Sequence, residues 1–418
     1  MNISDRNAKL SSTHNRFSYG WIIVTASALM IGVTYGLNYS FSVYFKPLAD
    51  HFGWDRATVS FIYSSSLIIR GGVSIGTGWL ADKYSVRWVM IGCGFLMGLG
   101  FLLSSQVTEL WQFFLTYAII EAIGLSGTFG VGTAIVARWF TKNRGLALGI
   151  AASGSGLGTL FIVPGIERLI AAVDWSQAFI VCGIVAGILM ITAAVFLREP
   201  HRQLTASYSS DNINLQDQSV SIKEAFKDTR MLLIALSFLF FFFGIQIVMV
   251  HLVNYATDTG IDPLISATFI SVIGAVSIAG RLSVGLGADR IGIINSLLLT
   301  RGFLVLSFLL LLFTNSTWSF YLFAVLFSIP YGGEITQIPL VIGRYFGTRS
   351  MATLMGVNVF VVTIGGALGP WLAGKIFDLT GSYDWAFIAG AVAAVFSVGM
   401  VLLLRNQDRQ HARRKNGF

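Results

Sequence analysis

Long apolar stretches alternate with short polar segments along the whole chain. Each stretch has about 20 residues or more, the length that an α-helix needs to cross about 30 Å of hydrocarbon. The pattern therefore predicts twelve membrane spans in two sets of six. The first set lies near residues 19–43, 58–79, 86–105, 111–136, 145–168 and 176–197, and the second near 231–255, 264–287, 293–313, 318–343, 351–376 and 384–404.

Polar segments mark the boundaries between the predicted domains. Residues 198–230 separate the two sets and are expected to form a cytoplasmic linker, between six-helix bundles at 19–197 and 231–405. Residues 1–18 and 406–418 are expected to be tails, the second one basic. The first apolar run is too long for the core of a signal peptide, so nothing is expected to be cleaved.

The two sets resemble each other at a nearly constant offset, which indicates an internal repeat. Six residues have a like residue 207 positions later: Gly53/Gly260, Asp55/Asp262, Gly78/Gly285, Asp82/Asp289, Lys83/Arg290 and Gly149/Gly356. An even number of spans per copy gives both copies the same orientation. We therefore expect an all-α membrane protein with two halves related by a pseudo-two-fold axis along the membrane normal, and a binding site between them near the midplane.

Composition and charge support this class. Only 11% of the residues are charged, against about 25% in soluble chains, which excludes an ordinary soluble enzyme. Of the 28 basic residues, 21 fall in tails and loops on one side. The positive-inside rule predicts that this side, with both termini, is cytoplasmic, in a cell (inner) membrane. The net charge of +8 is thus explained by basic residues that orient the chain in the membrane, and nucleic acid is not an expected partner.

Three further sequence features give no evidence for a metal, cofactor or phosphate site. Cys93 and Cys182 lie inside apolar runs and are expected to be small buried side chains, and no metal or cofactor is expected. The glycine-rich run GSGLG (154–158) has the composition of a phosphate-binding loop, but it does not follow a strand. Close helix packing explains it better.

Several motifs resemble those of a known transporter family. GWLADKYSVR (78–87) and its echo GLGADRIG (285–292) resemble the loop motif of the major facilitator superfamily. ARWFTKNRGLALGIAASGSGLG (137–158) resembles the fifth-helix motif of monocarboxylate transporters and of their oxalate/formate antiporter relatives, and YGW (19–21) and YFKPL (44–48) resemble the ends of the first helix in the monocarboxylate family. The resemblance implies twelve helices and transport of small carboxylates.

Arg281 lies inside an apolar span, where an arginine costs about 3 kcal/mol on insertion scales and normally needs a partner. No internal acid is an obvious partner in the sequence, and guanidinium matches the planar fork of a carboxylate. The resemblance also implies that an arginine eight residues before the loop aspartate, here Asp289, binds the substrate anion. The alternative is a structural arginine that is paired with a loop acid.

Departures from the family pattern narrow the expected substrate. Tyr39 aligns with a lysine of animal monocarboxylate transporters, and Ser277 with an aspartate, so their proton relay is missing. Asn358 stands where oxalate-type antiporters have a second cation. One fixed positive charge is expected to suit a monoanion, because a dianion would leave one carboxylate desolvated without a partner.

Other polar residues inside spans are candidates for the site. SIPYGGEITQIP (328–339) is expected to interrupt its helix, which would place Tyr331 as a hydroxyl donor and leave Glu334 beside a water-lined cavity. Tyr35, Asn38, Tyr39 and Tyr117 are further lining candidates, with core packing as the alternative.

Other charged or titratable residues are candidates for carrying the proton and for gating the transport path. Arg70 and Glu121 are expected to form a structural clasp, with Glu121 as a second choice for proton carriage beside Glu334 and His251. Asp82, Lys83, Asp289 and Arg290 are expected to form gates at the cytoplasmic ends of their helices, together with Arg138.

The leading hypothesis is a proton-coupled symporter of small monocarboxylates such as lactate or pyruvate, which works as a monomer by rocking of its halves. The main alternative is a carboxylate exchanger of the oxalate/formate type. An intramembrane serine protease built on Ser126 and His251 is a weaker alternative, because the duplicated architecture argues against an enzyme. A carboxylate sensor on a transporter scaffold would bind ligand without flux.

Overall fold

The computed structural model describes residues 3–140, 144–199, 224, 227–346 and 351–415, and within these ranges the regular structure is entirely helical. The first half contains α1 (Ile3–Phe52), α2 (Arg56–Lys83), α3 (Val86–Ser104), α4 (Leu110–Phe113), the π-helix η1 (Phe114–Glu121), α5 (Ala122–Ser126), α6 (Thr128–Trp139), α7 (Arg144–Val173) and α8 (Trp175–Phe196). The second contains α10 (Thr229–Asp258), α11 (Pro263–Ile291), α12 (Ile293–Leu311), α13 (Thr317–Phe346), α14 (Met351–Thr380) and α15 (Asp384–Lys415).

Twelve helical segments of the described chain are long and apolar enough to cross a membrane, as predicted. Each overlaps one predicted span, and the fourth, Leu110–Trp139, is assembled from α4, η1, α5 and α6. The polar segment 1–18, expected as a tail, continues α1 back to Ile3. Most of the expected linker 198–230 lies outside the described residues.

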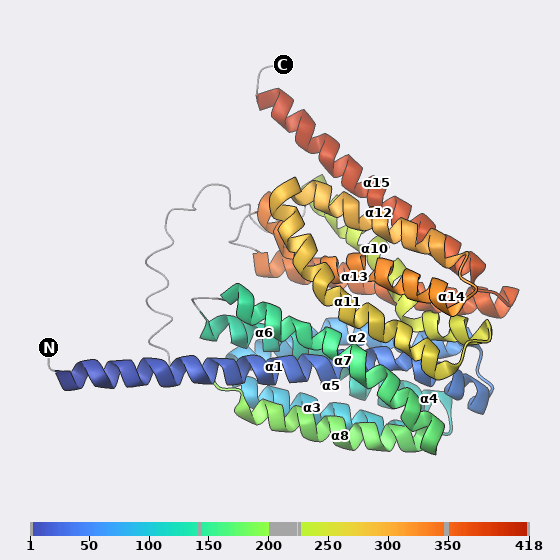
Figure 1. Ribbon diagram of the computed structural model, residues 1–418, viewed down its shortest axis with the longest axis horizontal. Coiled ribbons are helices and arrows are strands. Elements are labelled where there is room, and N and C mark those ends of the chain that lie inside the picture. The colour runs from blue at the N-terminus through green and yellow to red at the C-terminus, as the bar shows by residue number, and fades with distance from the viewer. Residues whose placement is uncertain (1–2, 141–143, 200–223, 225–226, 347–350, 416–418) are drawn as a thin grey trace.

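The helices form two bundles that lie side by side (Figure 1). Helices α1 to α8 make one, and α10 to α15 make the other. Helices α1 and α10 begin, and α8 and α15 end, toward the same end of the molecule, which we call the linker side. The opposite end, where α1 ends at Phe52 and α2 begins at Arg56, is the distal side.

The turns on the distal side confirm the repeat at atomic detail. Gly53 and Gly260 both have a left-handed backbone, with φ of 66° and 89°, which glycine adopts without steric cost. The aspartate two residues later then caps the next helix in each copy. Asp55 accepts from the backbone N–H of Thr58, and Asp262 accepts from those of Leu264 and Ile265. The repeated residues therefore perform the same structural task 207 positions apart.

Glycines let helices touch through their backbones, which confirms the packing interpretation of the 154–158 run. A Cβ on Gly154 or Gly158 of α7 would overlap the carbonyl oxygen of Ala28 or Gly32 of α1. In the second half, Gly365 of α14 lies equally close to the backbone of α10. Such close approach compensates for the weak hydrophobic drive for helix association inside a membrane.

The expected interruption of the tenth span is wrong. Helix α13 continues through Pro330 and Pro339 from Thr317 to Phe346. Each proline removes one backbone hydrogen bond, but packing keeps the helix intact, because Gly332 lies directly against the backbone of Ser277 on α11. Prolines are tolerated inside membrane helices that neighbouring helices support in this way.

Candidate functional site

A cavity of about 540 Å³ lies between the two bundles. It runs from Tyr35 and Tyr39, in the middle of α1, to Ala81 and Arg138 at the linker-side ends of α2 and α6. Most of its walls come from the first half, and α10 and α14 supply the rest. Its size is within the range of small-molecule sites. Polar side chains lining it are Thr34, Tyr35, Asn38, Tyr39, Ser74, Ser126, Thr133, Gln246 and Thr363.

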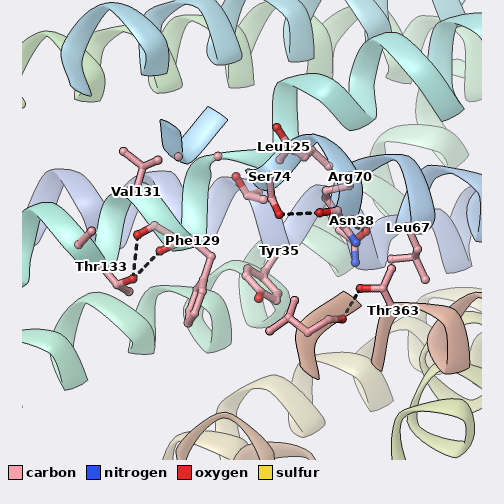
Figure 2. Close-up of a pocket in the computed structure, with 18 of the residues that line it drawn as sticks. Tyr35, Asn38, Leu67, Arg70, Ser74, Leu125, Phe129, Val131, Thr133 and Thr363 are labelled. Carbon is pink, nitrogen blue, oxygen red and sulfur yellow. Dashed lines mark hydrogen bonds between the residues drawn. The ribbon is translucent and has the colours of Figure 1, made fainter. Parts of the chain in front are cut away.

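The charged residues that line the cavity, as far as the structure describes its walls, are the two arginines Arg70 and Arg138. Arg138 stands at the linker-side mouth, where its guanidinium lies 3.9 Å from the carboxylate of Glu199. Arg70 lies deeper, on α2 (Figure 2). A cavity with this lining favours an anion over a cation.

Arg70 does not pair with Glu121, so the expected clasp is wrong. Its Nη1 donates to the Oδ1 of Asn38 at 2.8 Å, as Figure 2 shows. Glu121 is buried at the end of η1, where its backbone lies against Gly100 of α3 and its Oε1 has no hydrogen-bond partner. The neutral amide of Asn38 holds the guanidinium at the cavity wall, and the carboxylate remains inside the first half.

Asn38 continues a hydrogen-bond chain that crosses between the halves. Its Nδ2 donates to the hydroxyl of Tyr63 at 3.2 Å, and the Nε2 of Gln246 on α10 donates to the same hydroxyl at 3.3 Å. The other amide atom of Gln246, Oε1, is buried without a partner. Arg70 is thus positioned by residues of both bundles.

Arg281 lies on α11 at the interface between the halves, with 8% of its surface exposed. Its Nη1 donates to the backbone carbonyl of Ala152 on α7 at 2.8 Å, and its Nε has no partner. The side chain is outside the described lining of the cavity. No described acid pairs with Arg281, and most of its donor capacity is unused.

The candidate tyrosines separate into two groups. Tyr39 lines the cavity and packs edge-on against Tyr331 of α13 across the two halves, with ring centroids 6.0 Å apart. Tyr117 instead packs among rings of the first half, outside the described lining: Phe41, Phe101 and Phe113. The structure therefore places Tyr117 in the core, which was the alternative interpretation.

Two further candidates on the second half are buried. Asn358 has no hydrogen-bond partner at either amide atom and lies one residue before Val359, which lines the cavity. Glu334 on α13 is also buried. One helical turn further, Gln337 accepts from the fully buried Arg301 at 2.7 Å, so Glu334 and Arg301 belong to one polar cluster in the core of this half.

The distal side is closed by a polar cluster that sequence reasoning missed. The Nη1 of Arg56 lies 2.7 Å from the Oδ2 of Asp258, across the halves. The carboxylate of Asp378 accepts from the backbone N–H groups of Arg56 and Ala57, at 2.9 and 2.7 Å, and thereby caps α2 from the opposite bundle. Arg56 also donates to the hydroxyl of Tyr383 at 2.6 Å. No spacing pattern in the sequence links Arg56 to these acids.

His251 belongs to this distal cluster. Its Nε2 lies 2.9 Å from the carbonyl oxygen of Pro370, which can only accept, so Nε2 carries the proton of the neutral ring. Nδ1 then accepts from the hydroxyl of Tyr383 at 2.9 Å, and Ser60 of the first half is 3.3 Å from Nε2. Ser126, its hypothetical partner in proteolysis, instead lines the cavity and donates to the Ile123 carbonyl.

The predicted linker-side gates are described only in part. The ammonium of Lys83 lies over the ring of Trp79, 4.6 Å from its centroid, and Arg290 is exposed. The side chains of Asp82 and Asp289 lie outside the described residues. Among the described histidines, cysteines and carboxylates, no group of three could hold a metal ion.

Comparison with known proteins gives the family. A sequence profile described as Major Facilitator Superfamily matches residues 27–370 and 303–418. The chain belongs to this superfamily. It is therefore a multi-pass membrane transporter and not an enzyme.

Relatives and solved structures within the superfamily agree with this assignment. Human "Monocarboxylate transporter 12" is 26% identical over 411 residues, which cover 91% of this chain and 79% of the relative. Human "Monocarboxylate transporter 2" is 26% identical over 431 residues, covering 95% and 89%. A mutant of the nucleoside transporter NupG superposes with a TM-score of 0.74 at 16% identity, covering 93% and 99%.

A second solved structure is a bacterial homologue of the human lysosomal transporter Spinster, in an inward-facing and unoccupied conformation. It superposes with a TM-score of 0.70 at 15% identity and covers 92% of this chain and 95% of that one. Both superpositions agree with the twelve-helix fold of two six-helix halves.

Proposed function

We propose that the protein moves small monocarboxylates, such as lactate or pyruvate, together with a proton, by rocking of its two halves. The observation that carries the proposal is the charge of the space between the halves. Its described walls carry arginines and no carboxylate, and Arg281, at the same interface but outside the described lining, donates to the neutral carbonyl of Ala152. The names of the relatives support the same substrate class.

Arg281 is proposed as the principal ligand of the carboxylate. In this conformation the guanidinium uses one N–H on Ala152 and leaves Nε without a partner, a costly arrangement for a buried cation. A substrate carboxylate would satisfy two N–H groups at once and would take the place of the backbone carbonyl. Tyr39, Tyr331 and Asn358 are proposed to contact the rest of the substrate.

The conformation supports alternating access. The distal side is closed by Arg56, Asp258 and Asp378, and the cavity reaches the linker side. If the linker side is cytoplasmic, as the distribution of basic residues predicts, this is an inward-facing state. We also propose gate roles on the linker side for Arg138, Lys83, Arg290, Asp82 and Asp289. The proposal further includes location in the inner membrane and function as a monomer.

The proton is proposed to reside on one of the buried ionisable side chains of the two halves. Glu334 and Glu121 are buried carboxyls without an ion-pair partner in the described chain. His251 is a poorer candidate in this state, because both ring nitrogens are already bonded to groups of the distal closure. Glu334 is favoured over Glu121 because it shares its half with Arg281.

The experiment is uptake of labelled lactate into proteoliposomes, with and without an inward proton gradient. We expect the gradient to accelerate uptake and Arg281→Gln to lower it by a factor of about a hundred or more, since a buried charged hydrogen bond contributes about 1.5–3 kcal/mol and two are lost. Arg168→Gln, exposed at the distal end of α7, is the matched control and should transport normally. Full activity in Arg281→Gln would refute the proposal.

Carboxylate exchange is the second candidate, favoured by one observation: no acid is among the described residues that line the cavity. A proton carrier would then lie outside the site, whereas exchange needs none. Preloading the vesicles with unlabelled lactate distinguishes the two functions. Symport gives uptake into empty vesicles that follows the proton gradient, and exchange gives uptake only into loaded ones.

A further inference from the structure

We propose that the linker-side end of the first half binds the headgroup of an anionic phospholipid, with Arg87 and Arg198 in contact with the phosphate. The site lies apart from the cavity between the halves. It gives the transporter a lipid ligand in addition to its substrate, whatever that substrate is.

A second pocket, of about 300 Å³, lies at the linker-side ends of α3 and α8, which pack against each other. These two helices form the edge of the first bundle that faces away from the second (Figure 1). The pocket is lined by Tyr84, Ser85, Arg87, Trp88, Leu197, Arg198 and Glu199. None of them is among the described residues that line the cavity between the halves, so the substrate path does not account for this pocket.

Two arginines of the pocket have donors to spare. Arg87 donates through Nε to the carbonyl of Leu197 at 3.1 Å, and its two terminal nitrogens have no partner in the described chain. The guanidinium of Arg198 lies over the ring of Tyr19, 5.2 Å from its centroid, and forms no ion pair with a described acid. Both groups can therefore bind the oxygens of a phosphate, which match the guanidinium fork.

The charges around the pocket favour an anion. Its one lining carboxylate, that of Glu199, lies 3.9 Å from the guanidinium of Arg138 on α6. A further cation stands beside the pocket, because the ammonium of Lys83 lies 5.3 Å from the ring centroid of Tyr84. Cations therefore outnumber acids here, which attracts a negatively charged headgroup.

The backbone that carries Arg198 is held in place. Three successive carbonyl groups, at and just after the end of α8, each accept a hydrogen bond from another helix of the first half. The pairs are Tyr19 to Phe196 at 2.8 Å, Arg87 to Leu197 at 3.1 Å and Trp139 to Arg198 at 2.6 Å. A site fixed in this way before its ligand arrives loses less entropy on binding.

The surroundings of the pocket indicate a lipid. Trp88 and Tyr84 are 70% and 68% exposed where the third span begins. Phe95 lies about two turns further on the same face of α3, in the middle of the span, and is 58% exposed. An apolar ring exposed at that depth contacts acyl chains, so the pocket lies at the level of the headgroups, where Trp and Tyr concentrate.

The expected membrane leaflet agrees with an anionic lipid. The distribution of basic residues predicts that the linker side is cytoplasmic. Anionic phospholipids concentrate in that leaflet, and basic pockets between membrane helices bind their headgroups.

The experiment follows the melting temperature of purified protein in a neutral detergent during titration with phosphatidylglycerol or phosphatidylcholine. Phosphatidylglycerol should stabilise the wild type by mass action, and zwitterionic phosphatidylcholine should not. In Arg87→Gln/Arg198→Gln, the apparent affinity for phosphatidylglycerol should fall about thirtyfold, because two interactions of a basic side chain with an anionic headgroup are lost. An unchanged affinity, or equal stabilisation of the wild type by both lipids, would overturn the proposal.

The control is Arg405→Gln/Arg409→Gln, near the end of α15, which removes the same charge from the same side but outside the pocket. It should keep the wild-type affinity. Equal losses in the two double variants would show attraction by net charge alone, against a defined site. Glycerol phosphate, which has the phosphate without acyl chains, should not stabilise the wild type at the same concentration; if it does, the site binds a soluble anion and the lipid assignment is wrong.

A single variant covers the case in which the double variant does not fold, since Arg87 also supports the end of α8. Arg198→Gln removes a side chain that forms no hydrogen bond in the described chain, and it should lower the affinity about fivefold. Wild-type affinity in a folded Arg198→Gln protein would refute the site. Because lipid binding is the readout, these results do not depend on whether the protein carries monocarboxylates.

Discussion

Arg56 and Asp258 form an ion pair of 2.7 Å that joins the first half of the transporter to the second on the distal side. Asp378 strengthens this closure without a salt bridge, because it accepts from two backbone N–H groups at the start of α2. Arg56 therefore binds the second half twice, through its side chain to Asp258 and through its backbone N–H to Asp378. Opening the distal side requires all these bonds to break together.

Asp258→Asn should weaken the distal closure. A partly exposed ion pair contributes about 1 kcal/mol, so we expect the population open to the distal side to rise about fivefold. Spin labels at Asp50→Cys and Asn315→Cys, both exposed on that side, in a background without Cys93 and Cys182, would report longer separations.

Asp384→Asn is the control for this experiment, since Asp384 is exposed on the same side and forms no ion pair with the first half in the described chain. It should leave the label separation unchanged. Identical distance distributions for Asp258→Asn and wild type would contradict a role of the ion pair in closure.

Tyr383→Phe should destabilise the fold. The hydroxyl accepts from Arg56 and donates to His251, and its loss leaves a buried ring nitrogen without a donor, at a cost of about 1–3 kcal/mol. Burial raises the pKa of Tyr383 above its usual value, so the phenol stays protonated at every working pH. A lower melting temperature of the purified protein checks this. Tyr255→Phe, which loses one long bond to the Thr314 carbonyl, should change it less.

Gly158→Ala should disrupt the first half, because the new Cβ would overlap the backbone of Gly32 on α1. Overpacking of this kind costs about 1–3 kcal/mol or more. Gly165→Ala lies on the same helix with nothing within 4 Å of the added carbon, and it should be neutral or stabilising. Detergent-solubilised melting curves compare the two, and equal effects would contradict the packing argument.

Cysteine labelling tests the predicted orientation. In a background without Cys93 and Cys182, both buried, Asn315→Cys should react with a membrane-impermeant maleimide in whole cells, because it lies on the distal side. Gln410→Cys, exposed near the end of α15, should react only after lysis. The reverse pattern would place both termini outside.

The span pattern and the repeat could be predicted because each depends on local composition. Apolar length identifies a membrane helix in isolation, and the glycine and aspartate of each distal turn are needed by the turn itself. The continuity of α13 could not be predicted from its prolines, because it depends on the fit of Gly332 against α11.

Pairings of charged residues were harder to predict. Arg70 and Glu121 fall at similar depths in the sequence pattern, yet Asn38 binds the arginine, and which face each residue occupies is set by tertiary packing. The distal closure joins residues up to 327 positions apart, and no spacing rule relates them. Arg281 was identifiable because its isolation in an apolar span is itself the signal.

Helices α7 and α11 meet at Gly156 and Gly274, where a Cβ on Gly156 would be 2.6 Å from the Gly274 carbonyl oxygen. The side chains of Thr159 on α7 and Ile278 on α11 pack directly against the opposite glycines. A larger residue at either glycine would push the two helices apart. This crossing therefore sets how closely the two bundles can approach each other while one tilts on the other.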